Sequence, residues 1–260
     1  MKNLSNNNII HIKDGDIEYL QFRKLLEYKD KVKHCYTTKS NDYEVDDGVN
    51  YKRLYNSLKL DYNKLVKIKE QIHSNYVQVI NSEEEKPDKV DGLITNKKEI
   101  SFSLRFADCT PIYLYDPVKD VIGDIHSGWK GTVGKIAQVA VRKMMQEYNS
   151  NPEDIICCIG PAIGKCHFEV DEDVKNIFEN TFSYMHMNNR IIEKGEIKEG
   201  KQKYFIDTNL INRTMLEEIG LLKENIIESN ICTVCNKEVL HSYRVDGENA
   251  GRNTAIMSLI

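Results

Sequence analysis

The chain has 260 residues, a formal net charge of −4 and a pI near 6.0, with 40% hydrophobic and 29% charged residues. This is the composition of a globular protein, and it excludes a broad basic face for nucleic acid. No apolar stretch approaches the roughly 18 residues of a membrane span, and the polar N-terminal region lacks a signal-peptide core, so a cytoplasmic location is expected.

The predicted elements are a mixture of strands and helices. Residues 1–40 indicate short strands and one helix, 41–49 an acidic loop, and the stretch from 51 a helix with one apolar face formed by Tyr51, Leu54, Tyr55 and Leu58. Strands are expected at 76–80, 91–96, 100–108, 154–160, 225–235 and 254–260. Helices are expected at 133–148, within 166–182 after a short strand, and from Asp207 or Thr208, with an exposed excursion at 186–203. The pattern predicts an α+β fold of one domain, residues 1–260, with mixed β-sheets flanked by helices.

A hairpin is predicted where the apolar runs 111–115 and 121–126 flank the turn sequence "DPVK". If Tyr115 lies opposite Asp120, Cys109 lies opposite His126, with Cβ atoms about 4.5–5.5 Å apart. Thiolate and imidazole are zinc ligands, so this register predicts a shared metal ion. A register different by one residue would put His126 on the other face, and a half-buried cysteine beside a packed histidine fits the same pattern.

The glycine-rich stretch "SGWKGTVGK" follows this hairpin and leads into a helix. A helix N-terminus beside glycines attracts anions, and Lys130 adds a positive charge, although a plain strand–turn–helix joint is an equal reading. The metal site needs a third ligand, for which His73 and His167 are both candidates. Spacing alone does not choose between them.

The remaining cysteines carry weaker signals. Seven cysteines, an odd number, favour free or metal-binding thiols over disulfides. Cys232 and Cys235 have the spacing of a redox motif or half a zinc site, but a single such pair favours plain structural cysteines. Cys166 and His167 are adjacent and fit an auxiliary site or, more simply, a packing role.

Four motifs in order, ADC-x-P, H-x-GW-x-G, IGPAIG and SYR-x-D…GR, resemble the YfiH-like family, also called the polyphenol oxidoreductase or laccase-domain family. The resemblance runs from "CYTTK" to the C-terminus, and Gln71-Ile72-His73 matches the Gln-x-His step of the family. It implies a YfiH-like fold and one metal, usually zinc, held at the catalytic site by His73, Cys109 and His126. The resemblance therefore selects His73 over His167.

The family resemblance also implies a purine nucleoside phosphorylase type of activity. The implied reactions are phosphorolysis of adenosine, inosine, guanosine and methylthioadenosine, and deamination of adenosine. Here the turn reads Trp129-Lys130 where the family usually has Trp-Arg, and Lys39 stands in place of another arginine. Lysine keeps the charge but lacks the bidentate fork for phosphate, so the balance between the two reactions stays open. Candidate substrate or phosphate ligands are Lys39, Gln71, Lys130 and Arg244, with Arg252 as a further possibility.

Three hypotheses follow for the function. The first is a zinc-dependent enzyme whose partners are a purine nucleoside and phosphate, acting as a monomer without nucleic acid or membrane. The second is a copper-dependent polyphenol oxidoreductase, which the seven histidines and the lack of a His-x-His motif disfavour. The third is a non-catalytic metal-binding partner protein. Three protein ligands with an open fourth position are typical of catalytic zinc, which favours the first.

Overall fold

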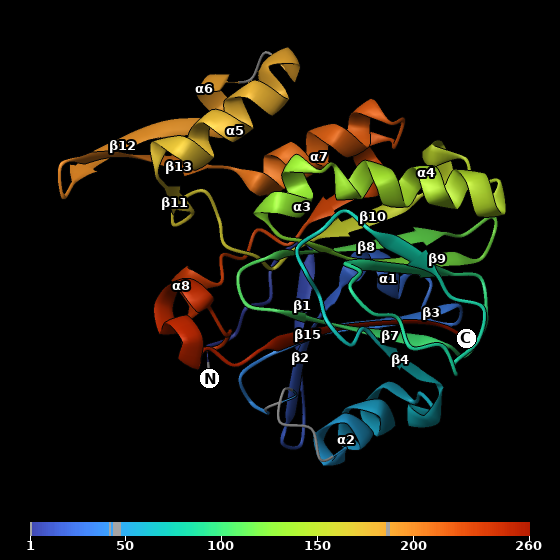
Figure 1. The fold of residues 1–260 in the computed structure, drawn as a ribbon. Coiled ribbons are helices and arrows are strands. Elements are labelled where there is room, and N and C mark those ends of the chain that lie inside the picture. The colour runs from blue at the N-terminus through green and yellow to red at the C-terminus, as the bar shows by residue number, and fades with distance from the viewer. Residues whose placement is uncertain (1, 42, 44–47, 186–187) are drawn as a thin grey trace.

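The computed structural model describes residues 2–41, 43, 48–185 and 188–260. Figure 1 shows two large sheets stacked on each other, with helices on their outer faces. The predicted α+β class is confirmed. Parts of the predicted acidic loop at 41–49 and of the predicted excursion at 186–203 lie outside the described residues.

The first six-stranded sheet has the order β1-β2-β3-β15-β7-β4. Its strands are β1 (Ile9–Asp14), β2 (Ile17–Phe22), β3 (Val32–Thr37), β4 (Leu65–Lys67), β7 (Ser101–Phe106) and β15 (Asn253–Leu259), and the short helix α1 (Arg23–Leu26) joins β2 to β3. The last strand, β15, lies in the middle and pairs antiparallel with both β3 and β7. Helix α2 (Val49–Leu58) packs on the outer face of this sheet and buries Tyr51, Leu54, Tyr55 and Leu58, which confirms the predicted apolar face.

The second six-stranded sheet has the order β14-β10-β8-β9-β6-β5. Its strands are β5 (Val77–Val79), β6 (Gly92–Thr95), β8 (Thr110–Asp116), β9 (Val121–Ser127), β10 (Ile156–Ile159) and β14 (Ile226–Glu228). Helices α4 (Ile136–Tyr148) and α7 (Thr208–Glu218) cover its outer face (Figure 1). Helix α3 (Trp129–Val133) precedes α4, and the single helix predicted at 133–148 is interrupted at Lys135, whose φ is +59°.

The main hydrophobic core lies between the two sheets. Strand β8 is buried along its whole length because its two faces serve different cores. Tyr113 and Tyr115 point into the core between the sheets, whereas Ile112 and Leu114 point toward α4. A strand covered on both faces is apolar without alternation, which explains the continuous run at 111–115.

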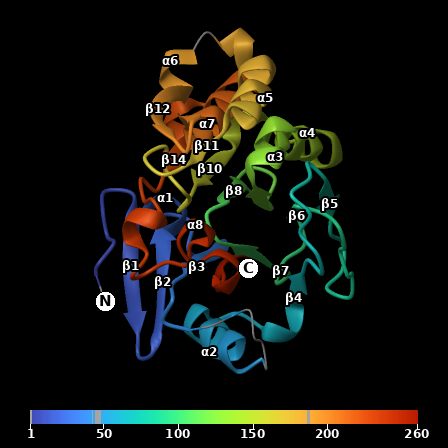
Figure 2. The same cartoon turned by 60° about the vertical axis from the view of Figure 1, so that its left-hand side comes forward.

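A smaller unit lies to one side of these layers (Figure 2). It is a three-stranded sheet of order β11-β13-β12 with two helices, formed by β11 (Glu169–Val170), α5 (Glu172–Phe182), α6 (Asn188–Ile191), β12 (Ile192–Lys198) and β13 (Lys201–Ile206). The exposed excursion predicted near 186–203 thus contains a β-hairpin that sequence periodicity missed. Helix α8 (Tyr243–Asp246) completes the chain before β15. Within the described ranges, every helix is too short or too polar to serve as a membrane-spanning segment.

Candidate metal centre and its cavity

The predicted register of the β8–β9 hairpin is wrong by two residues. Asp116 pairs with Val121, and His126 lies opposite Pro111 instead of Cys109. A shift of two residues keeps each side chain on its predicted face, because side chains alternate with a period of two. Cys109 and His126 therefore still meet, as diagonal neighbours at the end of the hairpin.

The three predicted ligands come together from separate parts of the chain. His73 lies in the connection from β4 to β5, Cys109 directly before β8, and His126 near the end of β9. One ligand atom of each residue lies within 4.8 Å of those of the other two. The two imidazole rings cross almost at right angles, with centroids 5.0 Å apart. His126 is buried and His73 is exposed, so the group leads from the core to the surface.

A buried carboxylate, Asp91, holds both histidines in place. Its Oδ1 accepts hydrogen bonds from His126 Nδ1 at 2.8 Å and from the His73 amide at 3.0 Å. Its Oδ2 accepts from the amide and the hydroxyl of Ser74, at 2.6 and 2.7 Å. These bonds keep His73 in a left-handed backbone conformation, φ +59°, which costs energy for a residue other than glycine. Because Nδ1 of His126 is bonded to Asp91, its other ring nitrogen, Nε2, is the one available to a metal.

Gly128 makes room for the ligand group. A Cβ atom at this position would lie 2.7 Å from Cδ2 of His73 and 3.2 Å from the sulfur of Cys109. The backbone φ of Gly128 is an ordinary −71°, so close approach and not conformation requires glycine here. The glycine of the predicted anion turn thus makes room for the three candidate metal ligands.

The electrostatics of the group favour a thiolate. Burial opposes ionisation of Cys109, but the neighbouring His126 and His73 outweigh it and lower the pKa of the thiol to about 6. Burial also opposes the charge of His126, whereas Cys109 and Asp91 raise its pKa to about 9. Although burial acts against it, hydrogen bonds from His126 and Ser74 hold the pKa of Asp91 below its usual value. Thiolate is the form of cysteine that binds metal.

The ligand group opens into a cavity of about 940 Å³. Its apolar wall includes Trp129, Phe168, Val170 and Val174. Its cationic lining residues are Arg105, Lys203, Arg244 and Arg252, and acidic residues line it as well: Glu70, Asp108, Glu169, Asp171 and Asp173. A volume of this order suits a small organic molecule, and the arginine side chains in its lining offer contacts for an anionic group.

Two of the four predicted substrate residues line the cavity and two do not. Gln71 and Arg244 line the cavity, but the Gln71 amide exchanges two hydrogen bonds with the backbone of Arg105. Lys39 and Lys130 do not line it: Lys39 pairs with Asp246 at 3.3 Å, and Lys130 is exposed beside Trp129.

Asp108, the residue before Cys109, forms hydrogen bonds with two distant segments of the chain. It is buried and has a φ of +82°. Its Oδ1 accepts a hydrogen bond from Thr233 Oγ1 at 2.5 Å, and its Oδ2 accepts one from the Arg244 amide at 2.6 Å. These two bonds hold the backbone next to Cys109 in place, which suits an orienting role for Asp108.

Sequence reasoning missed Asp91, Arg105 and Lys203. Arg105 lies in β7 and Lys203 in β13, and nothing in the local pattern marks either as a cavity residue. Asp91 is the first residue of the strand predicted at 91–96, and nothing in the local pattern marks it as a partner of His126. Cys166, His167, Cys232 and Cys235, left without a firm role by the sequence, form a second group with ligand atoms within 4.8 Å of one another.

Comparison with known proteins places this geometry in a family. The family model described as multi-copper polyphenol oxidoreductase laccase matches residues 34–260. Purine nucleoside phosphorylase LACC1 of Mus musculus is 31% identical over 227 residues, which cover 86% of this chain and 50% of that protein. Purine nucleoside phosphorylase CA_C1699 of Clostridium acetobutylicum is 34% identical over 215 residues, which cover 82% of each protein. This chain spans about half the length of the mouse and human relatives.

Solved structures show the same fold. The crystal structure of the Bacillus licheniformis hypothetical protein YfiH has a TM-score of 0.84 and 27% sequence identity, and the match covers 98% of this chain and all of that chain. The family resemblance seen in the four sequence motifs is thereby confirmed. The chain belongs to the multi-copper polyphenol oxidoreductase laccase family, whose relatives include proteins named purine nucleoside phosphorylases.

Proposed function

We propose that this chain is a zinc-dependent purine nucleoside phosphorylase. The observation that carries the proposal is the convergence of His73, Cys109 and His126 at a cavity of about 940 Å³ with an apolar wall and several cations. The names of the relatives supply the reaction class. The expected substrates are adenosine, inosine, guanosine and methylthioadenosine, and deamination of adenosine is proposed as a second reaction of the same cavity.

The residues fit a zinc ion by their chemistry. Two imidazoles and one thiolate are a donor set that zinc accepts, and three protein ligands leave a fourth position for a substrate or water. The Asp91–His126 hydrogen bond is the outer-shell contact that such histidines usually make. Bound there, the metal would supply Lewis acidity toward an oxygen or nitrogen of the substrate.

The rest of the cavity has groups suited to both reactants. Phosphorolysis joins a phosphate oxygen to the anomeric carbon of ribose while the bond from that carbon to the purine nitrogen breaks. Arg105 is the leading phosphate ligand, since its guanidinium makes a single long contact within the described residues, 3.5 Å to the Lys69 carbonyl. The guanidinium groups of Arg244 and Arg252 already donate to backbone carbonyls. Trp129 and Phe168 offer aromatic surface on which a purine can stack.

Copper oxidation fits the site less well. A multicopper oxidase uses clusters of several histidines, whereas the two metal-ligating groups found in the described residues contain three histidines together. Residues 1–260 are proposed to act as one domain, because β15 at the end of the chain pairs with β3 near its beginning.

The test is turnover of adenosine by the zinc-loaded protein with and without phosphate, with Cys109→Ala as the comparison. Phosphate-dependent release of adenine is expected, measured by liquid chromatography, and loss of the thiolate ligand should lower it by about 100-fold or more. Cys35→Ala, which removes a buried thiol outside the site, should keep the activity. Equal turnover by wild type and Cys109→Ala would refute the proposal, as would phenol oxidation by copper-loaded protein without nucleoside turnover.

A further inference from the structure

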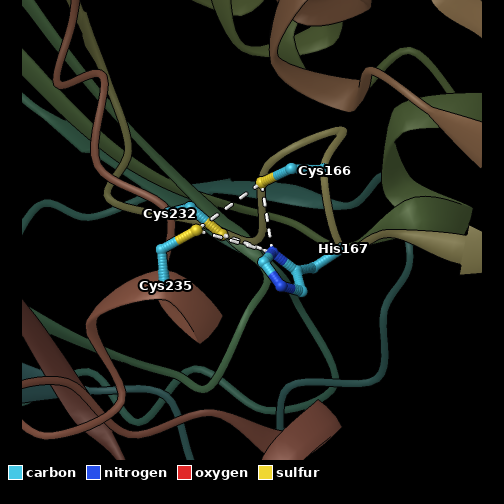
Figure 3. A group of neighbouring side chains, drawn as sticks. All are labelled: Cys166, His167, Cys232 and Cys235. Carbon is cyan, nitrogen blue, oxygen red and sulfur yellow. Dashed lines mark hydrogen bonds between the residues drawn. The ribbon is translucent and has the colours of Figure 1, made fainter.

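The second group of side chains that could bind a metal, Cys166, His167, Cys232 and Cys235, does not line the cavity described above. We propose that Cys166, His167, Cys232 and Cys235 form a structural zinc site that joins two loops of this chain. Figure 3 shows the four side chains pointing toward one another. Cys166 and His167 lie in the connection from β10 to β11, and Cys232 and Cys235 lie between β14 and α8.

Three distances within the group match the edges of a zinc tetrahedron. With Zn–S near 2.3 Å and Zn–N near 2.0–2.1 Å, tetrahedral geometry separates two sulfurs by about 3.8 Å and a sulfur from a nitrogen by about 3.6 Å. The sulfurs of Cys166 and Cys235 are 3.8 Å apart. His167 Nδ1 lies 3.7 Å from the sulfur of Cys232 and 3.6 Å from that of Cys235, with a shorter 3.1 Å to Cys166.

Hydrogen bonding alone does not account for this convergence. His167 Nδ1 faces three sulfurs, but one ring nitrogen carries at most one hydrogen and can donate to one of them. A separation of 3.8 Å between Cys166 and Cys235 is also far beyond the 2.03–2.05 Å of a disulfide bond. Three thiolates and one imidazole around a common point are the donor set of structural Cys₃His zinc sites.

The backbone around the group is built for such a site. The two loops are joined directly, since Ala162 and Cys232 form a parallel bridge and the Thr233 amide donates to the Ala162 carbonyl at 3.0 Å. The amide of Gly164 donates to the sulfur of Cys232 at 3.3 Å, a contact that stabilises a thiolate. A Cβ atom on Gly164 would lie 3.3 Å from the sulfur of Cys166, so glycine leaves room for the ligands.

The site would brace one wall of the cavity. The carbonyl of His167 accepts a hydrogen bond from Arg244 Nη1 at 2.7 Å, and the Glu169 carbonyl accepts one from Nη2 at 3.0 Å. The Arg244 amide in turn donates to Asp108, which precedes the ligand Cys109. A metal that fixes His167 and Cys232 therefore fixes the Phe168 wall and the backbone next to the first site. Its role is structural, and the proposal stands whether or not the chain acts on nucleosides.

Metal content separates the two sites without any substrate. Reduced apoprotein is loaded with zinc alone, passed over a desalting column and analysed for metal and protein. About two zinc ions per chain are expected for wild type, about one for Cys109→Ala, and none for the double variant Cys109→Ala/Cys235→Ser. As a matched control, Cys35→Ala in the Cys109→Ala background removes a buried thiol that is no ligand and should keep about one zinc ion.

The absorption spectrum of bound cobalt tests the ligand set independently. It is measured on Cys109→Ala loaded with cobalt alone, in which all four residues of the second group are intact. Tetrahedral cobalt with three thiolates should show strong visible bands and sulfur-to-cobalt charge transfer, and Cys235→Ser in this background should abolish both, because the double variant is expected to retain no metal. Zinc should also slow amide hydrogen exchange in residues 163–169. Folded, reduced Cys109→Ala that retains neither zinc nor cobalt would overturn the proposal.

Discussion

At the scale of single residues, the proposed metal centre depends on a side chain that is not one of its proposed ligands. Asp91 accepts hydrogen bonds from His126, from the His73 amide and from Ser74, so one carboxylate orients two of the three proposed ligands. It is fully buried, and each oxygen has at least two donors facing it. Such a carboxylate is expected to matter for affinity more than for the identity of the metal.

Replacing this carboxylate by an amide tests its role. Asp91→Asn should weaken zinc binding at the first site by about 10–100-fold, because an amide NH₂ would face donors that need an acceptor. Competition with a zinc chelator, in a Cys235→Ser background that removes the second group, gives the affinity. Asp88→Asn, in the same loop but paired with Lys69, is the control and should bind zinc as tightly as its parent. Unchanged affinity in Asp91→Asn would show that the ligands orient themselves.

At the scale of elements, the hairpin shows which part of a strand pairing the sequence predicts. Alternation of side chains determined the faces of Cys109 and His126, but the turn determined the register. Asp116 still pairs with Val121 while its Oδ1 accepts hydrogen bonds from the amides at 118 and 119. It is therefore both the last strand residue and the first turn residue, and composition alone assigned it only to the turn.

Helix α7 offers a prediction at the same scale. It begins where the sequence indicated, because Asp207 accepts a hydrogen bond from the Leu210 amide at 2.9 Å and so caps the first turn. Asp207→Ala should lower the free energy of unfolding by about 1 kcal/mol, measured by urea denaturation. Asp207→Asn keeps an accepting oxygen at the cap and should lose much less. Equal losses in the two variants would assign the effect to the charge near the helix terminus instead of the hydrogen bond.

At the scale of the whole molecule, stability rests on the packing of the two large sheets. His34 of β3 lies in this interface, buried, with its ring 6.0 Å from that of Tyr113 in the opposite sheet. Its Nε2 accepts a hydrogen bond from the Phe22 amide at 2.7 Å, so the ring is neutral. Burial lowers the pKa of His34 to about 3, well under the usual value of 6.5.

This histidine should make the whole fold sensitive to acid. The unfolded chain binds a proton at His34 below pH 6.5 and the native protein does not, so its stabilising contribution is complete above pH 6.5 and is lost as the pH falls toward 3. Between pH 7 and pH 5 the loss from this one group is about 2 kcal/mol. His34→Gln should be less stable at pH 7 but lose about 2 kcal/mol less over this interval in urea titrations. Parallel pH profiles for wild type and His34→Gln would contradict this assignment.

The sequence by itself determined the class of the fold, the amphipathic face of α2, the start of α7 and, through four ordered motifs, the family. These features are local, since periodicity, capping and motif spacing act within a few turns of one segment. Only the tertiary structure decided that Asp91 orients both histidines, that Arg105 and Lys203 line the cavity, and that Cys166, His167, Cys232 and Cys235 meet. The two loops of that second group are more than 60 residues apart in the chain, and their meeting depends on β10 pairing with β14. Pairing of distant strands is settled by the packing of the whole core, which no local pattern contains.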